Sequence, residues 1–119
     1  MSMLDKFKAM FGKPYESIGV ARARELLESG AVLVDVRSAA EFRSGHASVA
    51  QHCELSKVPS QATRIVRGRP VVFVCHSGMR SASAARMFAP NAQAPVASLR
   101  GGMIAWERAG GRVVTGRRR

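Results

Sequence analysis

The chain has 119 residues, 46% of them hydrophobic, and a formal net charge of +11 at pH 7. This length suffices for one domain with a single core, and the hydrophobic content argues against a disordered chain. The two cysteines are too few for a disulfide scaffold and lack the paired spacing of a zinc site, so the sequence predicts no metal and no cofactor.

Two features of the sequence bear on where the protein is located. No apolar run approaches the roughly 20 residues that span a membrane. Asp5, Lys6 and Lys8 interrupt the start of the chain, where a secretory signal would be apolar and unbroken. We therefore expect a cytoplasmic protein with no stable membrane insertion.

The positive charge comes mostly from arginines that lie singly along the chain. A basic domain gains counterion release when it binds phosphates, which makes nucleic acid the first partner to consider. The sequence lacks interleaved aromatic residues for base stacking and has no recognition-helix pattern, so no nucleic acid partner is expected. We expect a solvated basic surface, with residues 115–119 as a basic tail, whose field concentrates small anions near a cleft.

Residues 1–14 are predicted to form an amphipathic segment. Met3, Phe7 and Met10 share one helical face, and Pro14 ends the helix. Because the segment is short, a helix that docks on the domain is favoured over one that lies on a membrane surface.

The rest of the chain alternates between apolar strands and helices. In order, we expect a strand over 15–18, a helix over 19–30, a strand over 31–36, a helical turn over 39–42, a weaker strand over 49–55, a helix over 59–68, a strand over 70–74, a helix over 81–89, a strand over 96–99 and a helix over 103–111. Strands that are apolar on both faces predict an α/β fold, with helices flanking both faces of a mainly parallel sheet. In such sheets, ligands bind outside the carboxyl ends of the strands.

Cys75 stands at such an end, directly after the strongest predicted strand. The turn that follows consists of His76, Ser77, Gly78, Met79 and Arg80. A chain that turns between a strand and a helix presents successive backbone N–H groups to one point, where they bind an anion. Gly78 permits a left-handed dihedral or a close approach, and the bound anion can be the sulfur of the cysteine itself.

A reactive Cys75 requires interactions strong enough to lower the pKa of its thiol. Lowering a thiol pKa from about 8.5 to 7 takes about 2 kcal/mol, of which a helix terminus supplies roughly 0.3–1 kcal/mol. Several charge-assisted N–H bonds, with Arg80 nearby, must supply the rest. The alternative is a buried, unreactive thiol at a strand end, but the flanking Ser77, Gly78, Arg80 and Ser81 favour a nucleophile or a covalent sulfur carrier.

Three blocks of sequence, taken in order, resemble the motifs of the rhodanese-like sulfurtransferase family. They are "VLVDVRSAAEFRSGH" at 32–46, "CHSGMRS" at 75–81 and "LRGGMIAW" at 99–106. The resemblance covers residues 15–114, which we expect to form one rhodanese-like domain. It implies a five-stranded parallel sheet flanked by helices on both faces.

The resemblance also implies a reaction. The Cys75 thiolate would attack the outer sulfur of a small anionic donor such as thiosulfate, sulfite would leave, and a persulfide would form on Cys75. The sulfane sulfur would then pass to a thiol acceptor or to cyanide. The amides from His76 to Arg80 are expected to stabilise the negative charge on sulfur, and Arg80 to hold the sulfonate of the donor.

Two other functions are compatible with a cysteine in such a loop. Related phosphatases have five residues between the cysteine and the arginine, whereas four residues separate Cys75 from Arg80, so a phosphatase is a weak alternative. A persulfide carrier or interaction module that serves a partner protein, without turnover of its own, needs the same cysteine. The sequence does not separate this alternative from an enzyme.

Asp35, Arg37 and Ser81 are expected to support the site. Asp35 is predicted to accept backbone hydrogen bonds at its strand end, and Arg37 to pair with Glu41 on the next turn. Other expectations concern structural positions: a hydrogen-bonded structural His46, a solvent-facing His76, core anchors at Phe42 and Trp106, a tight turn at Gly101 and Gly102, and a small buried hydrophobe at Cys53.

Overall fold

The structure is a computed structural model that describes residues 14–117. The amphipathic segment predicted for 1–14, apart from its last residue, lies outside this range, as do the last two residues of the basic tail. Within the described range, no helix is long and apolar enough to cross a membrane.

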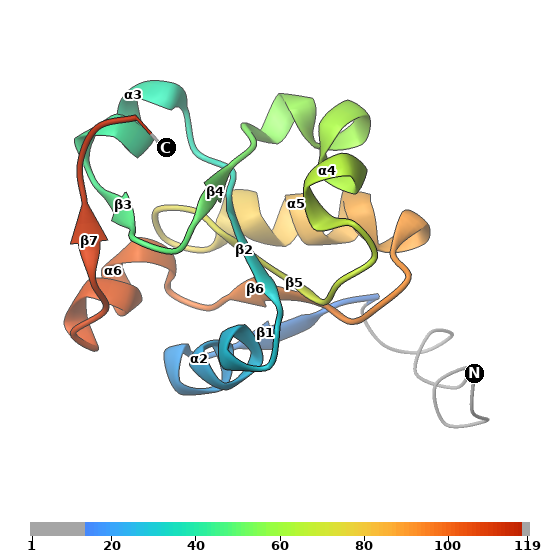
Figure 1. Ribbon diagram of the computed structural model, residues 1–119, viewed down its shortest axis with the longest axis horizontal. Coiled ribbons are helices and arrows are strands. Elements are labelled where there is room, and N and C mark those ends of the chain that lie inside the picture. The colour runs from blue at the N-terminus through green and yellow to red at the C-terminus, as the bar shows by residue number, and fades with distance from the viewer. Residues whose placement is uncertain (1–13, 118–119) are drawn as a thin grey trace.

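A five-stranded parallel sheet forms the centre of the molecule (Figure 1). Its strands lie in the order β1-β6-β5-β2-β4. They are β1 (Glu16–Ile18), β2 (Val32–Asp35), β4 (Gln51–His52), β5 (Val71–Val74) and β6 (Val96–Leu99). Strands β2, β5 and β6 are buried along their whole length, because they occupy the middle of the sheet and have helices on both faces. The predicted five-stranded α/β fold is therefore confirmed.

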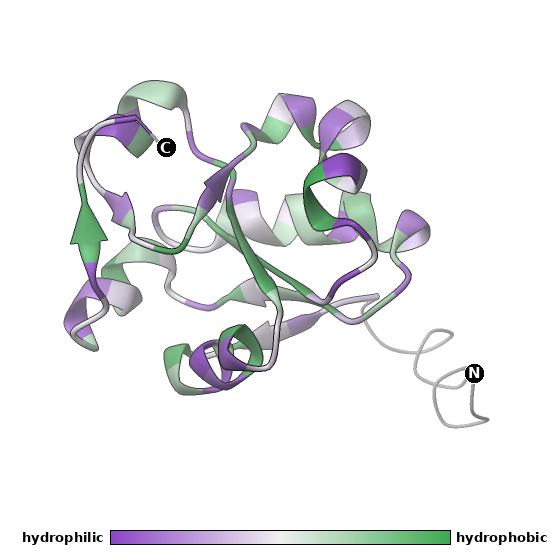
Figure 2. Ribbon diagram, in the orientation of Figure 1, coloured by the Kyte–Doolittle hydropathy of each residue, from purple (hydrophilic) through white to green (hydrophobic). Residues whose placement is uncertain are grey.

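Helices cover both faces of the sheet, as predicted. They are α2 (Val20–Glu28), α3 (Ala39–Ser44), α4 (Val58–Val66), α5 (Met79–Phe88) and α6 (Gly102–Arg108), with 3₁₀ turns η1 (Leu55–Lys57) and η2 (Ala89–Asn91). Val71 and Phe73 of β5 point into the core that α4 and α5 share. Val72 and Val74 point into the opposite core, beneath α2 and α6, since side chains of a strand alternate between its faces. Figure 2 shows hydrophobic colouring along β2 and β5.

Several predicted boundaries were wrong. The strand expected over 49–55 is reduced to β4, and the two-residue strands β3 (His46–Ala47) and β7 (Val113–Val114), which form an antiparallel pair, were not predicted. Strands of two residues are too short to show a hydrophobic period. More important for the site, α5 begins at Met79 and not at residue 81, because Gly78 completes the turn with a φ of 123°.

Candidate functional site

Cys75 directly follows the carboxyl end of β5 and begins the turn that leads into α5. Its side chain is 1% exposed. The backbone N–H of Gly78 donates a hydrogen bond to Cys75 Sγ over 3.1 Å. The structure therefore directs an amide of the loop at the sulfur of Cys75.

The pKa of the Cys75 thiol is shifted by two opposing effects. Burial raises it, whereas hydrogen bonds from the hydroxyl of Ser81 and from the backbone amides of Ser81, Gly78 and Ser77 lower it. The hydrogen bonds prevail, so the pKa lies below the ordinary value of a thiol. The groups that act on the sulfur extend one residue beyond the predicted loop, because the first turn of α5 still has amides without helical partners.

Ser81 connects the sulfur to the neighbouring strand β6. Its Oγ lies 3.5 Å from Cys75 Sγ, 2.8 Å from Ser98 Oγ and 3.1 Å from the carbonyl oxygen of Gly78. A hydroxyl rotates to suit its partners, so Ser81 can accept from a thiol and donate to a thiolate. Ser98 was not singled out from the sequence, although a polar residue within the buried strand 96–99 was a signal for it.

The orientation of the loop is set by α6. The N–H of Met103 donates to the carbonyl of Cys75 over 2.8 Å, and the N–H of Ile104 donates to the carbonyl of His76 over 3.3 Å. In a planar trans peptide the C=O and the following N–H point in opposite directions. Holding the His76 carbonyl toward α6 therefore turns the N–H of Ser77 away from α6.

The tight turn expected at Gly101 and Gly102 is confirmed, with φ values of 80° and 55°. Gly102 is buried against the loop. A Cβ at Gly102 would collide with the carbonyl oxygens of Cys75 and His76, because the two backbones are in direct contact there. A glycine at this position lets α6 approach closely enough to bind the loop carbonyls.

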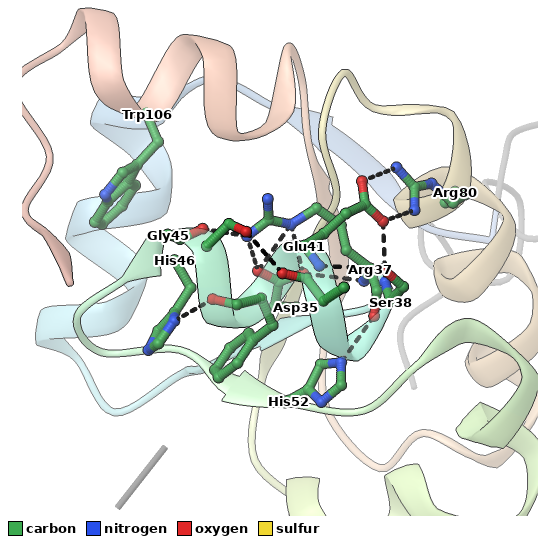
Figure 3. A network of polar contacts seen from close by, with 12 residues as sticks. Asp35, Arg37, Ser38, Glu41, Gly45, His46, His52, Arg80 and Trp106 are labelled. Carbon is green, nitrogen blue, oxygen red and sulfur yellow. Dashed lines mark hydrogen bonds and ion pairs between the residues drawn. The ribbon is translucent and has the colours of Figure 1, made fainter. Parts of the chain in front are cut away.

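Arg37 does not pair with Glu41, so that prediction was wrong. Its guanidinium binds Asp35 through Nε and Nη2, at 3.0 and 2.8 Å, and both side chains are buried (Figure 3). Asp35 also accepts the backbone N–H of Arg37, which confirms its predicted role at the strand end. Nη2 donates further to the carbonyl of Gly45 over 2.7 Å, so this buried ion pair joins β2 to the end of α3.

Glu41 instead binds Arg80, the last residue of the predicted loop. The two Nη atoms of Arg80 donate to the two carboxylate oxygens of Glu41 over 2.7 and 3.0 Å (Figure 3). Glu41 also accepts the N–H of Ser38, whose Oγ accepts the N–H of Glu41 in return, a capping box at the start of α3. The sequence did not predict this pair, because its members are 39 positions apart.

The pKa of Glu41 is lowered to about 2, chiefly by the hydrogen bonds from Arg80. The pKa of Arg80 is raised, first by its hydrogen bonds to Glu41 and further by the nearby charges of Glu41, Cys75 and Asp35. Both groups are therefore charged at neutral pH. The prediction that Arg80 holds the sulfonate of a donor stays a prediction, but its guanidinium is already bound to a carboxylate.

The histidines divide as expected between structural and exposed positions. His46 is buried, and its Nδ1 lies 2.7 Å from the carbonyl oxygen of Phe42, which confirms a hydrogen-bonded structural histidine. The ring of Phe42 stacks on His46 and on His52, with centroids 3.6 and 4.6 Å apart. His76 is exposed, as predicted, and so is Met79.

Other predicted positions are also confirmed as buried. Phe42 and Trp106 are core residues, at 3% and 5% exposure. Cys53 is buried among apolar neighbours, and burial raises its pKa, as fits a small hydrophobe. Within residues 14–117, no cluster of His, Cys, Asp and Glu side chains is placed to hold a metal ion.

A surface cleft of about 550 Å³ adjoins the loop at His76. It lies between α3, α6 and β7. Its other lining residues are Arg37, Ala40, Glu41, Ser44, Gly45, Met103, Glu107 and Val113. The cleft provides space for a molecule next to the loop and beside the Glu41 carboxylate.

The chain is similar in sequence to known proteins. A family model described as "Rhodanese-like domain" matches residues 20–109. The thiosulfate sulfurtransferase GlpE of Pseudomonas aeruginosa (strain LESB58) is 35% identical over 92 residues, which cover 77% of this chain and 84% of that protein.

Two solved structures are similar in fold. A rhodanese-related protein from Thermoplasma volcanium has a TM-score of 0.74 at 24% identity, over 84% of this chain and 98% of that chain. A protein of unknown function from Rhodopseudomonas palustris, described as a possible tyrosine phosphatase, has a TM-score of 0.73 at 31% identity, over 94% of this chain and 91% of that one. Both agree with the fold described above.

Proposed function

The chain belongs to the rhodanese-like family, and we propose from that premise that it is a sulfurtransferase that carries a sulfane sulfur as a persulfide on Cys75. The observation that carries the proposal is the hydrogen bond from the Gly78 amide to Cys75 Sγ, in a loop whose carbonyls are held by α6. An amide aimed at sulfur favours its negative charge, and a thiolate is the nucleophilic form of cysteine.

The first half-reaction loads the cysteine. With thiosulfate as donor, the Cys75 thiolate attacks the outer sulfur, a Cys75–S bond forms and the S–S bond of thiosulfate breaks. The bonding electron pair leaves with sulfite, and the transferred sulfur stays on Cys75 as a persulfide anion. The donor, the thiolate and the persulfide are all anionic, so the same loop amides stabilise negative charge throughout the step.

The second half-reaction removes the transferred sulfur from Cys75. A thiolate or cyanide attacks the outer sulfur of the persulfide, and the electron pair of the broken S–S bond returns to Cys75 as thiolate. The product is an organic persulfide or thiocyanate. The partners that this chemistry requires are a sulfur donor and a small or protein-borne thiol acceptor, and a reducing, cytoplasmic setting suits a free catalytic thiol.

The proposal names Cys75 as the nucleophile and its loop as the anion site. Ser77, Gly78 and Ser81 act directly on the sulfur, whereas His76 and Met79 face the solvent at the rim. Asp35 and Arg37 support the loop indirectly, through the buried pair that anchors α3. A phosphatase is not favoured, since the loop is one residue short and its arginine is bound to Glu41.

Intact-protein mass spectrometry tests the covalent intermediate directly. After incubation with thiosulfate, the wild-type protein should gain the mass of one sulfur atom, and Cys75→Ser should gain none. Cys53→Ala is the matched control, because it removes the other thiol and should leave the added sulfur in place. A folded wild-type protein that acquires no sulfur from thiosulfate or from an organic persulfide would refute the proposal.

A steady-state assay separates an enzyme from a carrier. Continuous formation of thiocyanate from thiosulfate and cyanide, lost in Cys75→Ser, is expected of an enzyme. Loading of Cys75 without turnover would identify the alternative, a persulfide carrier or interaction module that serves a partner protein.

A further inference from the structure

The guanidinium of Arg80 is bound to the carboxylate of Glu41. Both of its Nη atoms donate to Glu41, at 2.7 and 3.0 Å (Figure 3). The Glu41 carboxylate also accepts a hydrogen bond from the Ser38 amide over 3.0 Å, so its position does not depend on Arg80 alone. A bidentate pair of this kind occupies the Nη1–Nη2 edge of the guanidinium and neutralises its charge, so Arg80 offers a tetrahedral oxyanion less than a free arginine would.

The charges around the loop are not those of the chain as a whole. Arg37 is bound to Asp35 within the buried pair, as Arg80 is bound to Glu41. Among the described residues that line the neighbouring cleft, Glu107 adds a further carboxylate. These three carboxylates outnumber the two guanidinium groups, and the Cys75 thiolate adds another negative charge. Although the chain carries a net charge of +11, a dianion therefore meets no excess of positive charge from this set of groups.

Sulfane sulfur donors differ in what they demand of a site. Thiosulfate is a dianion whose sulfonate accepts several hydrogen bonds, and a free guanidinium is well suited to donate them. The persulfide of an organic thiol has no sulfonate, and its terminal sulfur is attached to an organic group through a single sulfur atom. Ala40 and Val113 give the cleft apolar surface, which suits an organic group.

We propose that Glu41 is a specificity-determining residue that occupies Arg80 and so makes the persulfide of an organic thiol, rather than thiosulfate, the preferred sulfur donor. This inference rests on the proposed function and names the donor class for the same site. Glu41 acts through Arg80 and does not itself touch the reacting sulfur.

The loading step with this donor is balanced without a further reactant. The Cys75 thiolate attacks the outer sulfur of R–S–SH, so that the Cys75–S bond forms and the S–S bond of the donor breaks. The electron pair leaves with the organic thiolate R–S⁻, and the proton remains on the transferred sulfur. The products are the Cys75 persulfide and a thiolate, and no sulfite is formed.

Single-turnover loading of Cys75 measures donor preference without an acceptor. The second-order rate constants for thiosulfate and for ethyl hydropersulfide would be measured by rapid quenching and intact mass, in wild type, Glu41→Gln and Glu25→Gln. Glutamine is accepted at the third position of a capping box, so Glu41→Gln retains the start of α3. Glu25 is the matched control, since it pairs with Arg22 on the exposed face of α2 and its substitution changes the net charge equally.

Wild type should load faster from ethyl hydropersulfide than from thiosulfate. In Glu41→Gln the ratio of thiosulfate to persulfide rate constants should rise at least tenfold, whereas Glu25→Gln should leave it within twofold. Sulfite binding provides a second measurement that does not depend on loading. In a Cys75→Ser background, Glu41→Gln should bind sulfite at least tenfold more tightly, because Arg80 is released.

The possible failures can be told apart. Faster loading of wild type from thiosulfate would overturn the donor class, and an unchanged ratio with unchanged sulfite affinity in Glu41→Gln would overturn the role of Glu41. In both cases Cys75 still becomes a persulfide and the proposed function stands. A Cys75 that takes sulfur from neither donor refutes the proposed function, and this inference with it.

Discussion

Replacing Ser81 by alanine tests whether the loop lowers the pKa of Cys75. The hydroxyl of Ser81 lies 3.5 Å from the sulfur, and its hydrogen bond is the largest of the interactions that favour the thiolate. A hydrogen bond to a charged group contributes roughly 1.5–3 kcal/mol, and this one is long, so we take about 1.5 kcal/mol. That energy corresponds to a rise of about one unit in the pKa, and so to an approximately tenfold smaller fraction of thiolate at pH values below the pKa.

The direction of the pH dependence follows from the sign of this shift. The pKa of Cys75 lies below the ordinary thiol value in the wild type and should rise in Ser81→Ala. The loading rate should therefore fall at a higher pH in the variant when the solution is acidified, and it should approach that of the wild type in alkali. The ultraviolet absorbance of the thiolate, titrated against a Cys75→Ser blank, reports the same pKa without a donor.

Ser98→Ala is the matched control for this variant. It removes the other end of the 2.8 Å hydrogen bond between Ser81 and Ser98 but keeps the hydroxyl next to the sulfur. Ser81→Ala takes the partner from the buried Ser98 hydroxyl and should cost about 1–3 kcal/mol of stability, whereas in Ser98→Ala the Ser81 hydroxyl still donates to the carbonyl of Gly78 and the cost should be smaller. The Cys75 pKa should rise clearly more in Ser81→Ala. Equal pKa values in wild type and Ser81→Ala, or an equal rise in both variants, would refute the reasoning.

Three further predictions concern stability, measured by urea unfolding with tryptophan fluorescence. Gly102→Ala should cost at least about 2 kcal/mol, because its Cβ meets backbone oxygens, whereas Gly110→Ala, also at positive φ but in open space, should cost only about 1 kcal/mol; equal costs would contradict the contact. Asp35→Asn breaks a buried ion pair and should cost about 3–5 kcal/mol, and a loss below 1 kcal/mol would contradict this. The pKa of Glu41 is lowered from 4.5 to about 2, so the stability that wild type gains over Glu41→Gln should be fully present above pH 4.5 and lost as the pH falls through 2; a difference that grows on acidification would have the wrong sign.

The regular elements were largely predictable because their signals are local. Strand β6 was predicted over 96–99 and is found there, since a short, mostly apolar run next to a helical pattern suffices to identify a strand. The apolar character of both faces predicted a parallel sheet under two layers of helices. By contrast, β3 and β7 depend on pairing between residues about 67 positions apart, and neither has a pattern of its own.

The candidate site was predictable to the extent that it depends on consecutive residues. A strand that ends at Cys75, followed by a turn with Gly78 and a helix, brings loop amides toward the sulfur by local backbone geometry. The hydrogen bonds from α6 to the loop carbonyls, which then fix the orientation of the loop, come from the tertiary structure. The start of α5 was misplaced by two residues. Met79 and Arg80 therefore belong to the first turn of the helix, and the contacts to the sulfur extend to Ser81.

The sequence by itself thus determined the alternation of strands and helices and the position of the nucleophile, because hydrophobic period and turn chemistry act between near neighbours. Only the tertiary structure decided which carboxylates Arg37 and Arg80 bind. Arg37 had Asp35 and Glu41 within reach along the chain, and burial beside the strand end selected Asp35. Arg80 reached Glu41 from a distant element, since the fold sets α3 beside the carboxyl end of β5. The ion pairs of the site form between side chains that the packed elements bring together, and spacing along the chain does not determine that proximity.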